Sequence, residues 1–111
     1  MEQEIMNIIL NAGDARAKCL IALRAARKGD FGKANEYLKI ATDSMVIAHK
    51  SQTELIQKEV SGEKQNVSLL MVHAQDHLMS ALAIKDLVIE LIEYARELHE
   101  IKNNERRDTD D

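Results

Sequence analysis

Apolar and small residues recur every three or four positions through the first half of the chain, which is the spacing of amphipathic α-helices. A first stripe comprises Ile5, Ile9, Ala12, Ala15, Cys19, Ala22 and Ala26, and a second comprises Ala34, Leu38, Ala41, Met45, Ala48, Gln52 and Leu55. Between them, Gly29 suits the left-handed position after a helix, and Asp30 can cap the next helix. The pattern predicts helices over about residues 3–28 and 31–59. The short connection makes them antiparallel.

A third apolar segment differs from the first two because it is apolar on two sides. The periodicity fails around residues 60–66, where Gly62 interrupts it and Asn66 can cap a helix predicted over about residues 67–102. One face of this helix carries Val67, Leu70, Ala74, Leu78, Ala81, Val88 and Ile92. A second carries Leu69, Val72, Asp76, Met79 and Ala83, and then becomes polar at Asp86 and Glu90. A three-helix bundle buries only one such stripe, so the second stripe predicts association between copies of the chain.

The predicted fold class is therefore all-α, an antiparallel three-helix bundle that forms a homo-oligomer. The length of 111 residues fits a single domain, which we assign to residues 1–103. The absence of proline and the 45% of hydrophobic residues, with only 3% aromatic, favour long helices packed by aliphatic side chains. Residues 104–111 carry no apolar anchor, and we expect this charged tail to be disordered.

Charge and cysteine content narrow the classes of function. A net charge of −4 argues against nucleic-acid binding, which relies on clustered basic residues. The single Cys19 cannot form an internal disulfide, and the start Met1-Glu2-Gln3-Glu4 lacks the features of a signal peptide. No apolar run approaches the roughly 20 residues of a membrane span. We expect a cytoplasmic protein without direct membrane insertion.

Four polar side chains lie within the otherwise apolar pattern of the third helix. They are His73, Gln75, Asp76 and His77. At about 100° per residue, His77 lies roughly 40° around the helix from His73 and one turn on, so the two imidazoles can share a ligand or a proton. Asp76 lies about 60° from His73 on the other side, and Gln75 points about 160° away. One helix cannot direct all four groups at one atom. An alternative is that the histidines are only partly exposed or hydrogen-bonded, without a site role.

Asp76 falls in the second apolar stripe, where a lone carboxylate would destabilise an oligomer seam. Symmetry could place copies of it around a cation, or the carboxyl groups could hold protons. Three Asp76 carboxylates around a hard divalent ion on a trimer axis would satisfy both charge and geometry. Gly13, inside the first helix, indicates a close helix contact. We expect His49 to serve packing and His99 to have no site role.

Several segments resemble the lactose/cellobiose-type enzyme IIA of the bacterial phosphoenolpyruvate-dependent sugar phosphotransferase system. The active-site motif of that family resembles the segment Val72-His73-Ala74-Gln75-Asp76-His77-Leu78-Met79. The family's first helix and turn resemble Ala12-Gly13-Asp14-Ala15-Arg16 and Gly29-Asp30-Phe31 with Lys33-Ala34. Its second helix resembles Ala48-His49 with Ser51-Gln52-Thr53. The resemblance spans about residues 5–98, and no motif position departs from the family pattern.

The resemblance implies a role for each residue of the motif. His73 would receive a phosphoryl group from the histidine-containing phosphocarrier protein and pass it to a cysteine of the cognate enzyme IIB. Gln75 and His77 would surround the phosphorylated residue, in part from a neighbouring subunit. Asp76 would bind a divalent metal ion, expected to be Mg²⁺, on the threefold axis of a homotrimer. The sugar would be a β-linked disaccharide such as cellobiose, chitobiose or lactose, and the Val-His-Ala motif favours the first two.

Two other interpretations of the residues stay open. His73 and His77 could jointly ligate Zn²⁺ in a metal-binding bundle, although a zinc site usually needs further His, Cys or Glu ligands. The chain could instead be an adaptor whose histidines are incidental. Phosphorylation that is labile in acid and stable in alkali would separate phosphoryl transfer from both.

Overall fold

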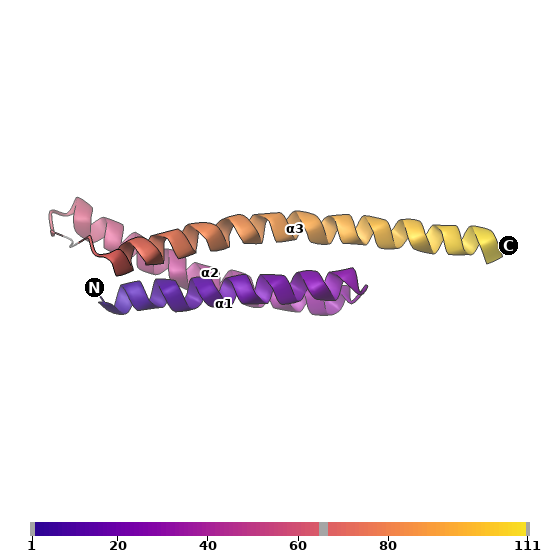
Figure 1. Ribbon diagram of the computed structural model, residues 1–111, viewed down its shortest axis with the longest axis horizontal. Helices are drawn as coiled ribbons and strands as arrows, with labels where there is room; N and C mark the ends of the chain where they lie inside the picture. The colour runs from indigo at the N-terminus through magenta and orange to yellow at the C-terminus, as the bar shows by residue number, and fades with distance from the viewer. Residues whose placement is uncertain (1, 65–66, 111) are drawn as a thin grey trace.

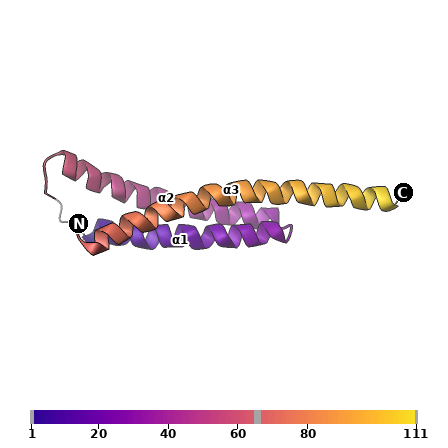
Figure 2. The same ribbon diagram turned by 45° about the horizontal axis from the view of Figure 1, so that its top comes forward.

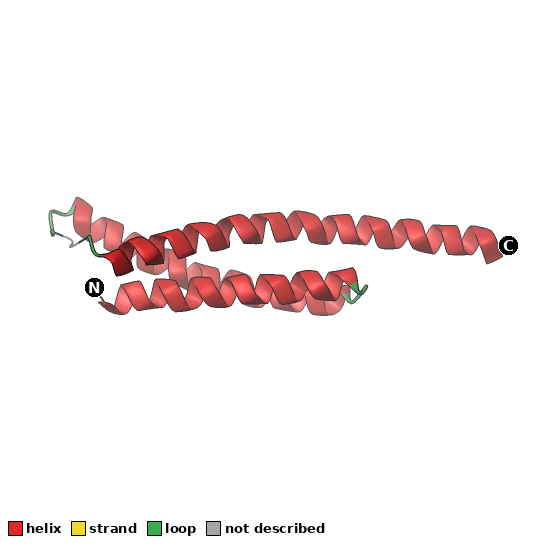
Figure 3. Ribbon diagram, in the orientation of Figure 1, coloured by secondary structure: helices red, strands yellow, loops and turns green. Residues whose placement is uncertain are grey.

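The computed structural model describes residues 2–64 and 67–110, and in this part of the chain the secondary structure consists of three helices. They are α1 (Glu2–Arg27), α2 (Phe31–Val60) and α3 (Leu69–Asp110), drawn in Figure 3. α1 and α2 run antiparallel, and α3 lies along them in the direction of α1 before extending past the α1–α2 turn (Figure 1). The molecule measures 71 by 21 by 17 Å. The prediction of an antiparallel three-helix bundle is confirmed.

The turn between α1 and α2 forms as its sequence predicts. Gly29 adopts a left-handed conformation, with φ of 84°. The Gly29 amide donates to the Ala26 carbonyl and the Asp30 amide donates to the Ala25 carbonyl, which is the hydrogen-bond pattern of a Schellman motif. The Asp30 carboxylate then accepts a hydrogen bond from the Lys33 amide at 3.1 Å and caps α2.

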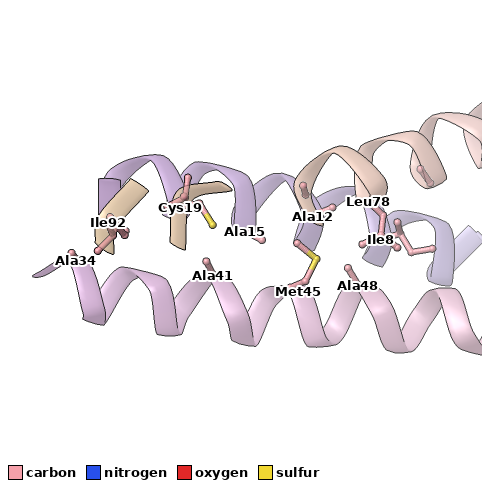
Figure 4. Packing of buried hydrophobic residues seen from close by; sticks show 14 of the residues in the cluster. Ile8, Ala12, Ala15, Cys19, Ala34, Ala41, Met45, Ala48, Leu78 and Ile92 are labelled. Carbon is pink, nitrogen blue, oxygen red and sulfur yellow. The ribbon is translucent and has the colours of Figure 1, made fainter. Parts of the chain in front are cut away.

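The core lies mainly between α1 and its two neighbours, and many of its side chains are alanines (Figure 4). Small side chains at the contact allow helix axes to approach closely, because little volume separates the backbones. The buried hydrophobic residues are Ile5, Ile8, Ala12, Ala15, Cys19, Ala22, Ala25, Ala26, Ala34, Ala41, Met45, Ala48, Leu55, Ala74, Leu78, Ala81, Val88 and Ile92. These include most of the three predicted stripes.

Aromatic and cationic side chains fasten α3 to the α1–α2 turn. The ring of His99 meets that of Phe31 edge-on, with centroids 5.5 Å apart. The guanidinium of Arg96 lies 4.9 Å from the Phe31 ring centroid, and Arg96 also donates a 2.8 Å hydrogen bond to Asn35. A side chain at Gly29 would lie 3.1 Å from His99 Cε1. His99 therefore packs against this turn.

The start of α3 differs from the prediction. The predicted cap, Asn66, lies outside the described residues. The helix begins at Leu69, and the Ser68 hydroxyl accepts a hydrogen bond from the Met71 amide at 3.1 Å, so Ser68 acts as the N-cap. Leu70 is 45% exposed, although the pattern placed it on the buried face. The end of α2 diverges from the first turns of α3 (Figure 2).

α3 extends beyond the end predicted at residue 102, into the segment for which we expected disorder, as far as Asp110. The helix continues through residues 103–110, and the side chains of residues 103–108 are exposed. The reason is local. The segment contains no glycine or proline, Glu and Arg favour helix, and extending an existing helix avoids the cost of nucleation. Tertiary packing is therefore not required to continue it.

Within the described residues, no helix is both long enough and apolar enough to cross a membrane.

Candidate functional site

Two histidines lie one helical turn apart near the start of α3. Their rings are nearly parallel, with centroids 5.6 Å apart and an interplanar angle of 17°. His73 is exposed, whereas His77 is half-buried between α3 and α1. The predicted common face for the two imidazoles is confirmed. The His73 ring is therefore accessible to a partner molecule, whereas the His77 ring is held by its neighbours.

The His77 imidazole packs against a glycine of α1. A Cβ placed on Gly13 would lie only 3.2 Å from His77 Nε2, closer than such contacts normally are. The prediction that Gly13 marks a close helix contact is confirmed, and His77 is the residue that makes it. The next residue, Asp14, accepts a 2.6 Å hydrogen bond from the Ser44 hydroxyl of α2 and forms an ion pair with Lys18 at 3.6 Å. These bonds fix this turn of α1 beside the histidines.

Gln75 lies away from both histidines, on the side of α3 that faces α2. Its side-chain oxygen accepts a hydrogen bond from Gln52 Nε2 at 2.6 Å, and both residues are half-buried. The angular prediction that Gln75 points away from His73 is confirmed. Within one copy of the chain, Gln75 is therefore bonded to α2 and is not directed at His73.

Asp76 lies on the exposed face of α3, together with Val72 and Met79, which are 51% and 57% exposed. The apolar face continues further than predicted. Beyond Ala83 it shifts by one position around the helix and exposes Leu87, Leu91, Tyr94, Leu98 and Ile101. Among the residues that the structure describes, no three His, Cys, Asp or Glu side chains gather closely enough to hold a metal ion. A metal site on Asp76 would need ligands from other copies.

The remaining candidate nucleophiles and histidines are placed differently. Cys19 is fully buried, and burial raises the pKa of its thiol despite the opposing charge of Lys85. Because a thiol must lose its proton to become a good nucleophile, Cys19 is unsuited to this chemistry. His49 is exposed on α2.

Sequence reasoning missed the partners of two site residues, namely Gln52 for Gln75 and His77 for Gly13. The polar Gln52 in an otherwise apolar stripe was the available signal for the first.

The comparison with known protein families decides the identity. The family model described as PTS system, lactose/cellobiose-specific IIA subunit matches residues 3–96. The chain belongs to this family. Enzyme IIA proteins are components of the sugar phosphotransferase system, so this lactose/cellobiose-type enzyme IIA is a phosphotransferase component.

Individual relatives of this enzyme IIA agree with the family. The lichenan-specific phosphotransferase enzyme IIA component of Bacillus subtilis is 47% identical over 100 residues, which cover 90% of this chain and 91% of the relative. The crystal structure of the cellobiose-specific enzyme IIA from Bacillus anthracis has a TM-score of 0.85 at 43% identity, covering 88% of this chain and 90% of that one. The chitobiose enzyme IIA of Escherichia coli, solved in solution as a complex with HPr, has a TM-score of 0.76 at 38% identity, covering 88% and 95%.

Proposed function

We propose that this enzyme IIA acts in the cytoplasm as a phosphocarrier, with His73 as the phosphorylated residue. The nitrogen–phosphorus bond on the histidine-containing phosphocarrier protein, HPr, breaks as a new one forms to an imidazole nitrogen of His73. The phosphoryl group then passes to the sulfur of a cysteine of enzyme IIB. The observation that carries the proposal is the exposed imidazole of His73, stacked on His77 in a member of a phosphotransferase family. A relative solved as a complex with HPr supports the choice of donor.

The chemistry suits an exposed imidazole. A neutral imidazole nitrogen is nucleophilic near pH 7, and phosphoryl transfer requires mainly in-line positioning and stabilisation of charge. A carrier must also meet two different proteins in turn, so its reacting atom has to be accessible. His73 meets this requirement, while the buried Cys19 does not.

We assign supporting roles to two further residues. His77, one turn on from His73, donates a hydrogen bond to the phosphoryl oxygens or offsets their charge when it carries a second proton. Gln75, held by Gln52 on the other side of α3, contributes to the site of a neighbouring copy rather than to its own. Both roles follow from the family resemblance, and the positions of His77 and Gln75 on α3 are compatible with them.

Assembly into a homotrimer is the second part of the proposal. The exposed apolar face of α3 runs from Leu69, which is 86% exposed, to Ile101, which is 53% exposed. A face of this length is unusual for a monomer and is typical of an interface. Copies of the chain can cover it if their α3 helices pack around a common axis.

The two sides of the apolar face of α3 carry opposite charges. Leu91 and Tyr94 form a ridge on α3 between two open grooves. One groove, about 380 Å³, carries the basic residues Arg27 and Lys102. The other, about 440 Å³, is lined by Glu90, Glu93 and Glu97. In a cyclic assembly each copy presents one side to the next copy and the opposite side to the previous copy, so an acidic groove can meet a basic one.

Reversing charges tests this arrangement. Glu93→Lys and Arg27→Glu should each weaken the trimer, by about 0.5–1 kcal/mol at each interface, and the double variant should recover much of the loss. Sedimentation equilibrium over a range of concentrations measures the change. Single variants that assemble like the parent chain, or a double variant weaker than both, would contradict the proposed pairing.

A divalent metal ion, expected to be Mg²⁺, completes the proposed assembly. The residue that would hold it is Asp76, whose exposed carboxylate lies on the apolar face. One carboxylate from each of three copies provides the oxygen ligands that a hard cation prefers, so the donor chemistry fits the ion. When bound, the ion would balance the charge of the clustered carboxylates. No step of the phosphoryl transfer depends on it.

The proposed sugar is a β-linked disaccharide of the cellobiose, chitobiose or lactose type. The relatives are described as specific for lichenan, lactose, cellobiose and diacetylchitobiose, which supports this class without selecting one member. Deleting the protein from its host and measuring the uptake of each sugar would make the selection, and undiminished uptake of all of them would argue against the class.

The central test is the phosphorylation of His73. The parent chain should acquire label from phosphorylated HPr, and the label should be lost in acid and stable in alkali. His73→Ala should not be labelled, whereas His49→Ala, which alters an exposed histidine on α2, should be labelled as the parent chain is. Persistent labelling of His73→Ala would overturn the assignment. An unlabelled parent chain would favour the adaptor or metal-binding interpretations.

A further inference from the structure

Gly13 stands out among the glycines of the helices because of what lies against it. A Cβ built there would be 3.2 Å from His77 Nε2, so the imidazole would have to move by a few tenths of an ångström. At Gly32, the other helical glycine, the nearest atom is Asp30 Oδ1 at 3.9 Å, an ordinary contact. Gly13 has no unusual backbone angle that would require glycine, since the positive φ values among the described residues belong to Gly29 and Gly62.

Glycine is disfavoured in the interior of a helix, because it loses more backbone freedom on folding than alanine does. Gly13 lies in the middle of α1, and alanine occupies the neighbouring buried positions 12 and 15. The contact with His77 gives a specific reason for the exception. Without a side chain at this position, the Nε2 edge of the imidazole can lie directly against α1.

The backbone of α1 cannot easily withdraw from an added methyl group. Ala12 and Ala15 are fully buried on either side of Gly13. Asp14 is bonded to Ser44 of α2 at 2.6 Å, which ties this turn to the neighbouring helix. The half-buried ring of His77 is the more mobile partner, so it is the imidazole that would be displaced. Besides the contact with Gly13, the His77 ring is held by its near-parallel stacking on the His73 ring.

We propose that Gly13 is a positioning residue for phosphoryl transfer. It leaves the space in which the His77 imidazole lies parallel to His73, and a side chain there would push the imidazole out of this arrangement. The inference rests on the proposed function, because it assumes that His77 assists a phosphoryl group on His73. In this proposal Gly13 acts only through the His77 imidazole.

The test compares Gly13→Ala with the matched control Gly32→Ala. We expect Gly13→Ala to accept phosphate from phosphorylated HPr about tenfold more slowly than the parent chain, since a displacement near 1 Å can cost about a hundredfold. Its melting temperature should be unchanged or higher, because alanine favours helix. Gly32→Ala should react at the parent rate. In NMR spectra, the ring signals of His77 should shift in Gly13→Ala and stay in place in Gly32→Ala.

A double variant separates positioning from other effects. In a His77→Ala background, adding Gly13→Ala should change the rate less than twofold, because the residue through which Gly13 acts is gone. An equal slowing in both backgrounds would overturn the proposal, as would a parent-like rate with unmoved His77 signals. Failure of the parent chain to be phosphorylated would instead overturn the proposed function. The NMR comparison would then still decide whether Gly13 positions the ring.

Discussion

Under the proposed function, the stacked pair of imidazoles predicts how strongly His77 would stabilise phosphorylated His73. Replacing His77 with Gln removes the possibility of a positive charge and keeps a hydrogen-bond donor, and replacing it with Ala removes both. The difference between the two variants therefore reports the hydrogen bond, and the loss common to both reports the charge. His49→Gln, on the exposed side of α2, is the matched control for a histidine away from the pair.

The spacing of the rings sets the size of the effect. The ring centroids of His73 and His77 are 5.6 Å apart. Two unit charges at this separation interact by about 0.7 kcal/mol in water and about 3 kcal/mol at an effective dielectric constant of about 20. A phosphoryl group carries between one and two negative charges at neutral pH, and His73 is exposed. We therefore expect about 1–2 kcal/mol, which is about a 5- to 30-fold change in the equilibrium for phosphate transfer.

The assay mixes the chain with phosphorylated HPr and measures the equilibrium ratio of the two phosphoproteins by ³¹P NMR. Both His77 variants should shift the ratio towards phosphorylated HPr. The shift should shrink in about 1 M salt, where the Debye length falls to about 3 Å. A ratio that is the same in the parent chain and both variants at low salt would refute the reasoning. A shift that salt leaves unchanged would refute its electrostatic part.

Three further predictions concern stability and assembly. Asp76→Leu should abolish metal binding, measured by calorimetry with Mg²⁺, yet sedimentation should show a trimer that is equally stable or more stable by about 1–4 kcal/mol. Leu78→Ala, at a fully buried position, should lower the free energy of unfolding by about 2–5 kcal/mol in urea denaturation. The Lys58 hydrogen bond lowers the pKa of Glu4 to about 2, so the advantage of the parent chain over Glu4→Gln in thermal melts should persist above pH 4.5 and vanish as pH falls towards 2.

The helices could be predicted because their signals are local. Apolar residues at three- and four-residue steps mark a buried stripe, and a glycine followed by a capping residue marks a turn. Gly29 and Asp30 act as the sequence indicates, the first in the left-handed region and the second as the cap of α2. The end of α3 could not be predicted in this way, because a charged segment without apolar anchors gives no signal for helix beyond its intrinsic propensity.

The candidate site could be predicted only up to the surface of one helix. The rotation of about 100° per residue separated His73 and His77 from Asp76 and Gln75, and the structure has the same separation. Contacts between helices depend on how far one helix is shifted along another, which periodicity does not specify. The glycine in α1 and the histidine in α3 could each be recognised as unusual. Their meeting required the relative placement of the two helices.

The three faces of α3 explain why so small a domain carries so many exposed apolar residues. One face packs on α1 through Ala74, Leu78 and Ala81, and a second presents His73 to solvent. The third face, which carries Asp76, is exposed. Because the histidines and Asp76 occupy different faces, covering the third face with copies of the chain need not cover His73. The same helix can therefore hold the proposed assembly together and keep an imidazole available to the two proposed protein partners in turn.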